Sequence, residues 1–443
     1  MNFLEALDAE MEDIASACTT CGKCFQACPM TEAVGIEQAD PREVLTGMVS
    51  LLRGGEGTDE ARRWAAACSS SGLCADACDY GVDPRMLVRL ANYGHIRTRD
   101  GNAVKINAMK SFRSMAKTVR VVSRLQLPQS EIDRLQPVGK TDRIEKPDVA
   151  MYTGCNIHKT PHILVLCLEV LQQIGATYEV VGGPSACCGI NQFRSGDGET
   201  SGRAGLGTLD QIERIGAETK VSWCASCQSQ FDEIIIPGHR RMTGDTSFEL
   251  TPYFVFLESR LEQLKPLFTR RVDKVVAINE RPGLPEVTRA VKAILSAIPG
   301  VRLVELEVPR VGLMYNYLTV TPRFKDELRD REFRAAAEAG VTTLATVFHA
   351  CHRELCHFEK DVSFEIINVM EIIGESMGLH AEDIYKRLKM MDDVDQMIAE
   401  CSDLIARNGL DANEARDILL ADQKAAKPLQ GGFMERPLPA PIS

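Results

Sequence analysis

Two adjacent cysteines followed by a glycine, Cys187-Cys188-Gly189, stand out in this 443-residue chain. Neighbouring thiols cannot bridge each other without strain, but both can reach one metal centre, and glycine allows a tight turn around it. Three further cysteines also follow predicted strands, namely Cys155, Cys224 and Cys227. Because the loops after parallel strands converge on one edge of a sheet, we expect these five sulfurs to form one metal site.

A second group of cysteines lies near the N-terminus and has the spacing found in bacterial ferredoxins, Cys18-x2-Cys21-x2-Cys24-x3-Cys28-Pro29. In such a run the first three thiolates bind one iron–sulfur cluster and the fourth reaches a second cluster. The interleaved scheme therefore assigns four ligands to a [4Fe-4S] cluster, which are Cys18, Cys21, Cys24 and Cys78.

The next cysteines depart from that pattern, because Ser71 stands where a further cysteine is expected in Cys68-x5-Cys74-x3-Cys78. A cubane that lacks one thiolate tends to lose the iron at that corner. The spacing therefore predicts a [3Fe-4S] cluster bound by Cys28, Cys68 and Cys74. It is similar to the spacing in the iron–sulfur subunit of succinate dehydrogenases. A [4Fe-4S] cluster with Ser71 or water as fourth ligand is the alternative.

Composition limits the roles open to the chain. Sixteen cysteines without a signal peptide favour metal binding over a disulfide scaffold. No apolar run is long enough to span a bilayer, so we expect a cytoplasmic protein with no transmembrane segment. The formal charge of −11 argues against nucleic-acid binding, although residues 85–146 carry fourteen Lys or Arg against five Asp or Glu. That stretch is either a solvated linker or a docking face for an acidic partner.

Hydrophobic periodicity divides the chain into five parts and predicts a mixed α+β and α/β fold class. An α-helical, ferredoxin-like domain with two clusters is expected over residues 1–126, followed by a proline-punctuated linker over 127–147. Strands then alternate with helices in a first unit over 148–265 and in a second over 272–380, with the same order of elements. Residues 381–443 are predicted to form a helical extension and a Pro-rich tail.

The second α/β unit lacks the cysteines of the first, and only the loop at 349–357 keeps ligand-type residues, three histidines and two cysteines. Three interpretations are open: a decayed ligand loop that lines the neighbouring site, a polar patch for acid–base chemistry or a partner contact, and a true metal site. His349 and His352 suit proton delivery because imidazole titrates near neutral pH. A helix is predicted to follow over 363–379.

The two cysteine-rich regions together resemble the heterodisulfide reductase family. The similar arrangement is a fusion of its ferredoxin-like C subunit with its catalytic B subunit, as in the D subunit of the membrane-linked enzyme, and covers about residues 15–360. In that family each cysteine-rich CCG domain binds a noncubane [4Fe-4S] cluster. The resemblance implies one such cluster here, with the ligands Cys155, Cys187, Cys188, Cys224 and Cys227. The second unit then corresponds to a degenerate CCG domain.

The resemblance implies an oxidoreductase that acts on a sulfur group, as the iron–sulfur subunit of a soluble heterodisulfide-reductase-like complex. Its substrate would be a disulfide, a thiol or lipoate-bound sulfur, and its candidate catalytic residues are Cys187, Cys188, His349, Cys351 and His352. No G-x-G-x-x-G fingerprint follows a predicted strand, so we expect a flavoprotein partner beside other iron–sulfur subunits. The alternative is an electron relay from a flavin dehydrogenase of the glycolate, lactate or glycerol-3-phosphate type towards quinone.

Overall fold

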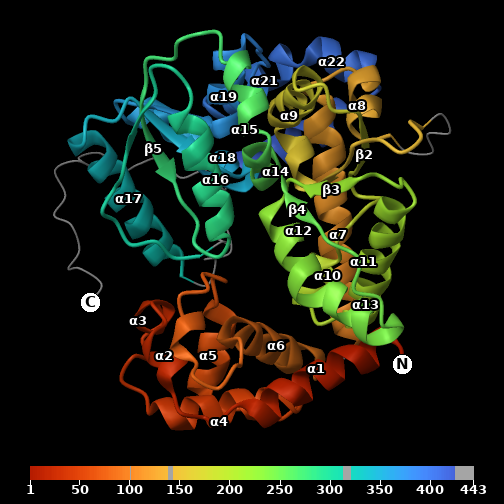
Figure 1. The fold of residues 1–443 in the computed structure, drawn as a ribbon, viewed down its shortest axis with the longest axis vertical. Coiled ribbons are helices and arrows are strands. Elements are labelled where there is room, and N and C mark those ends of the chain that lie inside the picture. The colour runs from red at the N-terminus through yellow and green to blue at the C-terminus, as the bar shows by residue number, and fades with distance from the viewer. Residues whose placement is uncertain (100, 138–142, 313–320, 425–443) are drawn as a thin grey trace.

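The computed structural model describes residues 1–99, 101–137, 143–312 and 321–424. Figure 1 shows the N-terminal helices as one layer, two α/β units side by side against it, and the last helices on the far side of those units. The predicted fold class, a helical ferredoxin-like domain before two α/β units and a helical extension, is confirmed. None of the described helices is both long and apolar enough to cross a membrane.

The N-terminal layer consists of short helices whose ends hold the first cysteines. Cys18 directly follows the first helix and Cys68 directly follows the fifth. Side chains of Asn2, Asp40 and Thr58 cap the starts of three of these helices, which fixes the turns between them. The elements are α1 (Phe3–Ala17), α2 (Lys23–Gln26), α3 (Met30–Ala33), α4 (Pro41–Leu52), α5 (Asp59–Ala67), η1 (Ala75–Ala77) and α6 (Pro84–Arg97).

The first α/β unit is built on a parallel sheet with the strand order β2-β1-β3-β4. Its central strand is buried along its whole length, as expected for a parallel strand covered on both faces. The elements are β1 (Val149–Gly154), η2 (Asn156–Lys159), α9 (Pro161–Gln173), β2 (Tyr178–Gly182), α10 (Ile190–Arg194), α11 (Gly198–Glu213), β3 (Thr219–Ser222), α12 (Ala225–Gln230), η3 (Phe231–Ile235), α13 (Ile236–Thr243), β4 (Thr251–Pro252), α14 (Tyr253–Ser259), α15 (Leu261–Leu264) and η4 (Lys265–Leu267).

The second α/β unit repeats that topology with the parallel order β6-β5-β7-β8. The helix predicted over 363–379 is wrong in its first part, because Ile366 and Ile367 pair with β7 as a strand and the helix begins only after Asn368. The elements are β5 (Val275–Asn279), α16 (Pro285–Ser296), β6 (Arg302–Val304), α17 (Pro322–Glu338), β7 (Thr343–Thr346), α18 (His349–Leu355), η6 (Cys356–Asp361), β8 (Glu365–Asn368) and α19 (Val369–Met377).

Two helices that follow the N-terminal layer in the chain and four at the end of the chain complete the fold. Helix α8 lies within the segment predicted to be a linker, where Ile132 and Leu135 are buried. Cys401 is buried with Val121 in a core shared by α7 and the final helices. The Pro-rich tail predicted at the C-terminus lies outside the described residues. The elements are α7 (Gly101–Arg124), α8 (Gln129–Leu135), α20 (Ile384–Lys389), α21 (Val394–Glu400), α22 (Ser402–Arg407) and α23 (Ala412–Lys424).

Helix α6 joins the N-terminal layer to the first α/β unit through a buried carboxylate. Glu233 of η3 pairs with Arg85 at 3.0 Å and also with Arg89, which in addition donates a hydrogen bond to the Ser229 carbonyl oxygen at 3.1 Å. Removing one partner of such a buried group leaves a charge without compensation. At these positions the basic stretch over 85–146 is therefore neither a solvated linker nor a free docking face.

Candidate metal centres

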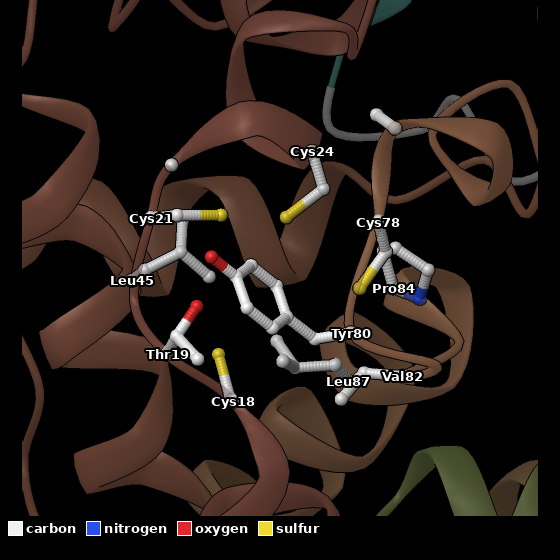
Figure 2. A pocket seen from close by; sticks show the side chains of 12 residues that line it. Cys18, Thr19, Cys21, Cys24, Leu45, Cys78, Tyr80, Val82, Pro84 and Leu87 are labelled. Carbon is white, nitrogen blue, oxygen red and sulfur yellow. The ribbon is translucent and has the colours of Figure 1, made fainter.

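The first cysteine group surrounds a pocket in the N-terminal layer. Figure 2 shows the side chains of four cysteines around the pocket, which Tyr80 also lines. Burial raises the pKa of the Cys24 thiol to about 12, so without a cation this sulfur stays protonated at neutral pH. Four cysteine side chains around one otherwise largely apolar pocket fit an iron–sulfur cluster. The cysteines that line the pocket are Cys18, Cys21, Cys24 and Cys78.

The second group consists of Cys28, Cys68 and Cys74. Burial, followed by the nearby thiols of Cys68 and Cys28, raises the pKa of Cys74 to about 12. Trp64 donates its Nε1–H to the Cys28 sulfur at 3.2 Å, a contact that tunes a metal-bound thiolate. The Ser71 hydroxyl oxygen instead accepts a hydrogen bond from the Leu73 amide at 3.4 Å. The structure thus gathers three cysteines here and engages the serine in a local turn.

The third group lies at the carboxyl edge of the first sheet, as the strand order requires. Cys155 directly follows β1, Cys187 and Cys188 follow β2, and Cys224 directly follows β3, with Cys227 in the first turn of α12. Each of the five is at most 9% exposed. The Cys188 thiol interacts with those of Cys187 and Cys227, and the Cys155 thiol lies near those of Cys188 and Cys224. The five sulfurs therefore meet, as the sequence predicts.

The chemistry of this third group also fits a cluster. Burial raises the pKa of the Cys155 thiol to about 12, so a buried cation is needed to hold it as a thiolate. Gly154 has φ +74°, and a Cβ there would lie 3.0 Å from the Cys227 sulfur and 3.2 Å from the Cys224 Cβ. The backbone of β1 can approach these two residues so closely only because position 154 has no side chain.

A cavity of about 410 Å³ extends between α7, α10 and α11 and reaches Cys187. Its wall combines cationic side chains, Lys105 and Arg203, with the apolar side chains of Met109 and Phe112. Mixed apolar and polar linings of this size are typical of small-molecule sites. The sequence did not reveal this cavity, because α7 comes from outside the α/β unit and its position is set by tertiary packing.

The corresponding edge of the second unit is occupied by charged groups. Helix α18 begins after Phe348 as α12 begins after Cys224, so Cys351 is the counterpart of Cys227. Burial raises the pKa of the Cys351 thiol, and the nearby Arg281 opposes that shift. Glu332 pairs with Arg310 at 2.7 Å and accepts a hydrogen bond from Asn279 at 2.5 Å. Ion pairs thus stand where the first unit has sulfurs.

The two candidate catalytic histidines of α18 contact different parts of the structure. His349 accepts a hydrogen bond from the indole of Trp223, the residue before Cys224, at 3.2 Å, and thus reaches the edge of the five-cysteine site. Burial lowers the pKa of His349 well below its ordinary value, so the ring is neutral at pH 7. His352 instead pairs through Nε2 with Asp383 at 2.6 Å. His349 and His352 thus lie on one helix but have different hydrogen-bond partners, Trp223 and Asp383.

Lys159 is a candidate proton donor that the sequence did not reveal. It ends η2, four residues after Cys155, and is only 8% exposed. Burial, followed by the charge of Arg353, lowers its pKa to about 7. A lysine at the end of a short helical turn is usually solvated, and its position after a ligand-type cysteine was the one available signal.

Two family models match the chain. Residues 14–82 match the model of a 4Fe-4S dicluster domain, and residues 149–232 match that of a cysteine-rich domain called CCG. The first match spans both N-terminal cysteine groups, and the second spans all five cysteines at the edge of the first sheet. No curated protein matches the chain. The chain therefore combines an iron–sulfur electron-transfer domain of the dicluster type with a CCG domain, as expected of an iron–sulfur redox protein.

Proposed function

We propose that this chain is the iron–sulfur subunit of a heterodisulfide-reductase-like complex that reduces or forms a sulfur–sulfur bond. The proposed ligands of the noncubane [4Fe-4S] cluster are the five cysteines at the edge of the first sheet, and those of the N-terminal [4Fe-4S] cluster are the four cysteines in Figure 2. When bound, the noncubane cluster would exchange electrons with a sulfur atom of the substrate. A sulfur-oxidising, lipoate-linked complex is one form of this proposal.

The cavity that reaches Cys187 is the observation that carries the proposal. An electron relay needs short distances between its centres, whereas a sulfur substrate needs room beside a ligand cysteine. The cavity supplies that room, and the Arg203 side chain in its wall suits a substrate with an anionic end. Lys105 also lines the cavity but pairs with Glu199 at 3.1 Å, and Asp197 adds one negative charge to the wall. Met109 and Phe112 offer apolar contact to the carbon chain of a dithiol.

Filling the cavity tests this function. Reduced methyl viologen would supply two electrons, one per dye molecule, to lipoamide disulfide, which takes up two protons and becomes the dithiol. Ala204 lines the cavity, so Ala204→Trp is expected to raise the KM for lipoamide disulfide by about tenfold or more, since it excludes the substrate. The rate of reoxidation of the reduced protein by a one-electron dye should stay unchanged.

Asp210→Trp provides the matched control, because Asp210 is exposed on the same helix and does not line the cavity. It is expected to leave both rates unchanged. If neither wild type nor control turns over any thiol or disulfide while dye reoxidation is rapid, the chain is an electron relay of a flavin dehydrogenase. Turnover that is insensitive to Ala204→Trp would separate the activity from this cavity.

We also propose a [3Fe-4S] cluster at Cys28, Cys68 and Cys74. The turn formed by Ser71 supports it, because that position offers no thiolate. The oxidised protein should show a three-iron EPR signal near g of about 2, and Ser71→Cys should diminish that signal by supplying a fourth thiolate. Cubane signals alone in the wild-type protein would refute the three-iron assignment and favour a [4Fe-4S] cluster with a serine or water ligand.

An iron–sulfur subunit of such a complex needs a surface on which its partner subunits dock. We propose that a flavoprotein and further iron–sulfur subunits dock on the N-terminal layer, in the cytoplasm. Tyr80 and Leu73 support this docking face, because they are 55% and 48% exposed and belong to the segment that carries Cys74 and Cys78. Large exposed apolar side chains beside a redox site are typical of a surface for a partner.

A further inference from the structure

Four ligand-type side chains meet where the two α/β units join the C-terminal helices. His162 lies in the first turn of α9, His352 on α18, Glu371 in the first turn of α19, and Asp383 caps α20. One donor atom from each residue lies within 4.8 Å of the others. The group thus connects the first unit, the second unit and the helical extension.

The imidazole of His162 points to a missing ligand at this place. Its side chain is 1% exposed, yet neither ring nitrogen has a hydrogen-bond partner. A buried polar group without such a partner costs about 1–3 kcal/mol. Its Nδ1 lies 3.4 Å from an oxygen of Asp383, and its Nε2 lies 3.7 Å from an oxygen of Glu371. The ring therefore lies within ion-pair distance of two carboxylates but makes no hydrogen bond to either.

The other three side chains are held in place by second contacts. Thr346 lies 3.4 Å from Nδ1 of His352, which directs Nε2 of that ring towards Asp383. The backbone N–H of Asn368 donates a hydrogen bond to Glu371 at 2.7 Å, and the backbone N–H of Lys386 donates one to Asp383 at 2.9 Å. Such outer contacts are typical of metal ligands, because they fix the orientation of each donor.

We propose that His162, His352, Glu371 and Asp383 bind one zinc ion that ties the three parts of the chain together. Zinc takes four nitrogen and oxygen ligands at about 2.0–2.2 Å, which places neighbouring donors about 3.4 Å apart in a tetrahedron. One nitrogen of His162 would bind the ion, so the 3.4 Å contact of its Nδ1 with Asp383 and the 3.7 Å contact of its Nε2 with Glu371 are alternatives. The four donors lie within 4.8 Å of one another, so they must move closer together around the ion, while the 2.6 Å contact between His352 and Asp383 must lengthen.

Donor type and number distinguish this site from the others in the chain. Two imidazoles exclude the oxygen-only preference of magnesium and calcium, and four protein ligands match a structural zinc site with no open position. Of the histidines and cysteines in the 349–357 loop, His352 alone takes part. A bond across all three parts suits an ion whose role is to hold α20 against the α/β units.

Metal analysis and zinc K-edge absorption of the full chain, purified anaerobically with its clusters, test the proposal. We expect about one zinc per chain and a first shell of nitrogen and oxygen near 2.0 Å. The double variant His162→Gln, Asp383→Asn should lose at least about tenfold of the zinc while its iron content and cluster EPR signals stay unchanged. His380→Gln, an exposed histidine close to Asp383 in sequence, should keep its zinc.

Several outcomes would overturn the zinc site. A sulfur shell near 2.3 Å would place zinc on the cluster cysteines instead. Less than about one zinc per ten wild-type chains after growth with added zinc would leave a buried polar network of two histidines and two carboxylates instead of a metal site. Manganese in the same shell, or zinc retained in full by the double variant, would also refute the assignment.

Discussion

Gly154→Ala is expected to leave the purified chain with about four fewer iron atoms, the content of one [4Fe-4S] cluster, and without disulfide reduction. The added Cβ would lie 3.0 Å from the Cys227 sulfur and 3.2 Å from the Cys224 Cβ, so both side chains must move away from the position where the five sulfurs meet. Iron and acid-labile sulfide analysis, together with EPR spectra of the oxidised protein, measure the loss. The signals of the N-terminal clusters should remain.

Gly175→Ala separates the steric effect from backbone strain. Gly175 has φ +76°, close to the +74° of Gly154, but nothing lies within 4 Å of a Cβ built there. Both variants therefore carry a similar conformational penalty, of about 1 kcal/mol or more, and only one displaces cysteines. Equal iron loss in both would show that strain alone is responsible. Full iron in Gly154→Ala would contradict the five-cysteine ligand set.

The sequence predicted which cysteines lie close together, for a different reason in each region of the chain. The spacing from Cys18 to Cys28 places its sulfurs within a few turns of chain, and short spacings leave little conformational freedom. The site at Cys155 spans three loops, yet parallel strands bring their carboxyl ends to one edge whatever helices lie between them. The position of each cysteine after a parallel strand therefore predicts that they meet, although they are far apart in sequence.

Other features could not be predicted because they depend on packing between distant parts. The apolar residues of 363–379 fit a helix as well as a strand. Ile366 and Ile367 form the strand β8 because they pair with β7. His162 and Asp383 belong to elements that meet only in the folded chain. The wall of the cavity at Met109 likewise depends on how α7 lies across the first unit. Periodicity carries no information on such contacts.

Lys159→Met is expected to stabilise the protein at pH 7 by about 4 kcal/mol and to reduce the rise of stability with pH. The pKa of Lys159 is lowered from 10.5 to about 7 in the folded chain, and each pKa unit corresponds to about 1.4 kcal/mol. Burial is the main cause; Arg353 and Lys389 add to the lowering, whereas Asp422 and Cys155 oppose it. Methionine fills similar volume without a charge to desolvate.

The direction in which stability changes with pH follows from the number of protons that each state binds. Between pH 7 and 10.5 the unfolded chain holds a proton on Lys159 that the folded chain has largely released. The stability of the wild-type protein therefore increases with pH across this window. Below pH 7 Lys159 is protonated in both states, and the free-energy cost of burying its charge is at its maximum. Apparent melting temperatures of the cluster-loaded protein at pH 6, 7.5 and 9 measure this slope. Lys265→Met, whose side chain is 48% exposed, is the control and should keep the wild-type slope. A Lys159→Met protein that keeps the wild-type slope would show that the pKa of Lys159 is not lowered in the folded, cluster-loaded chain.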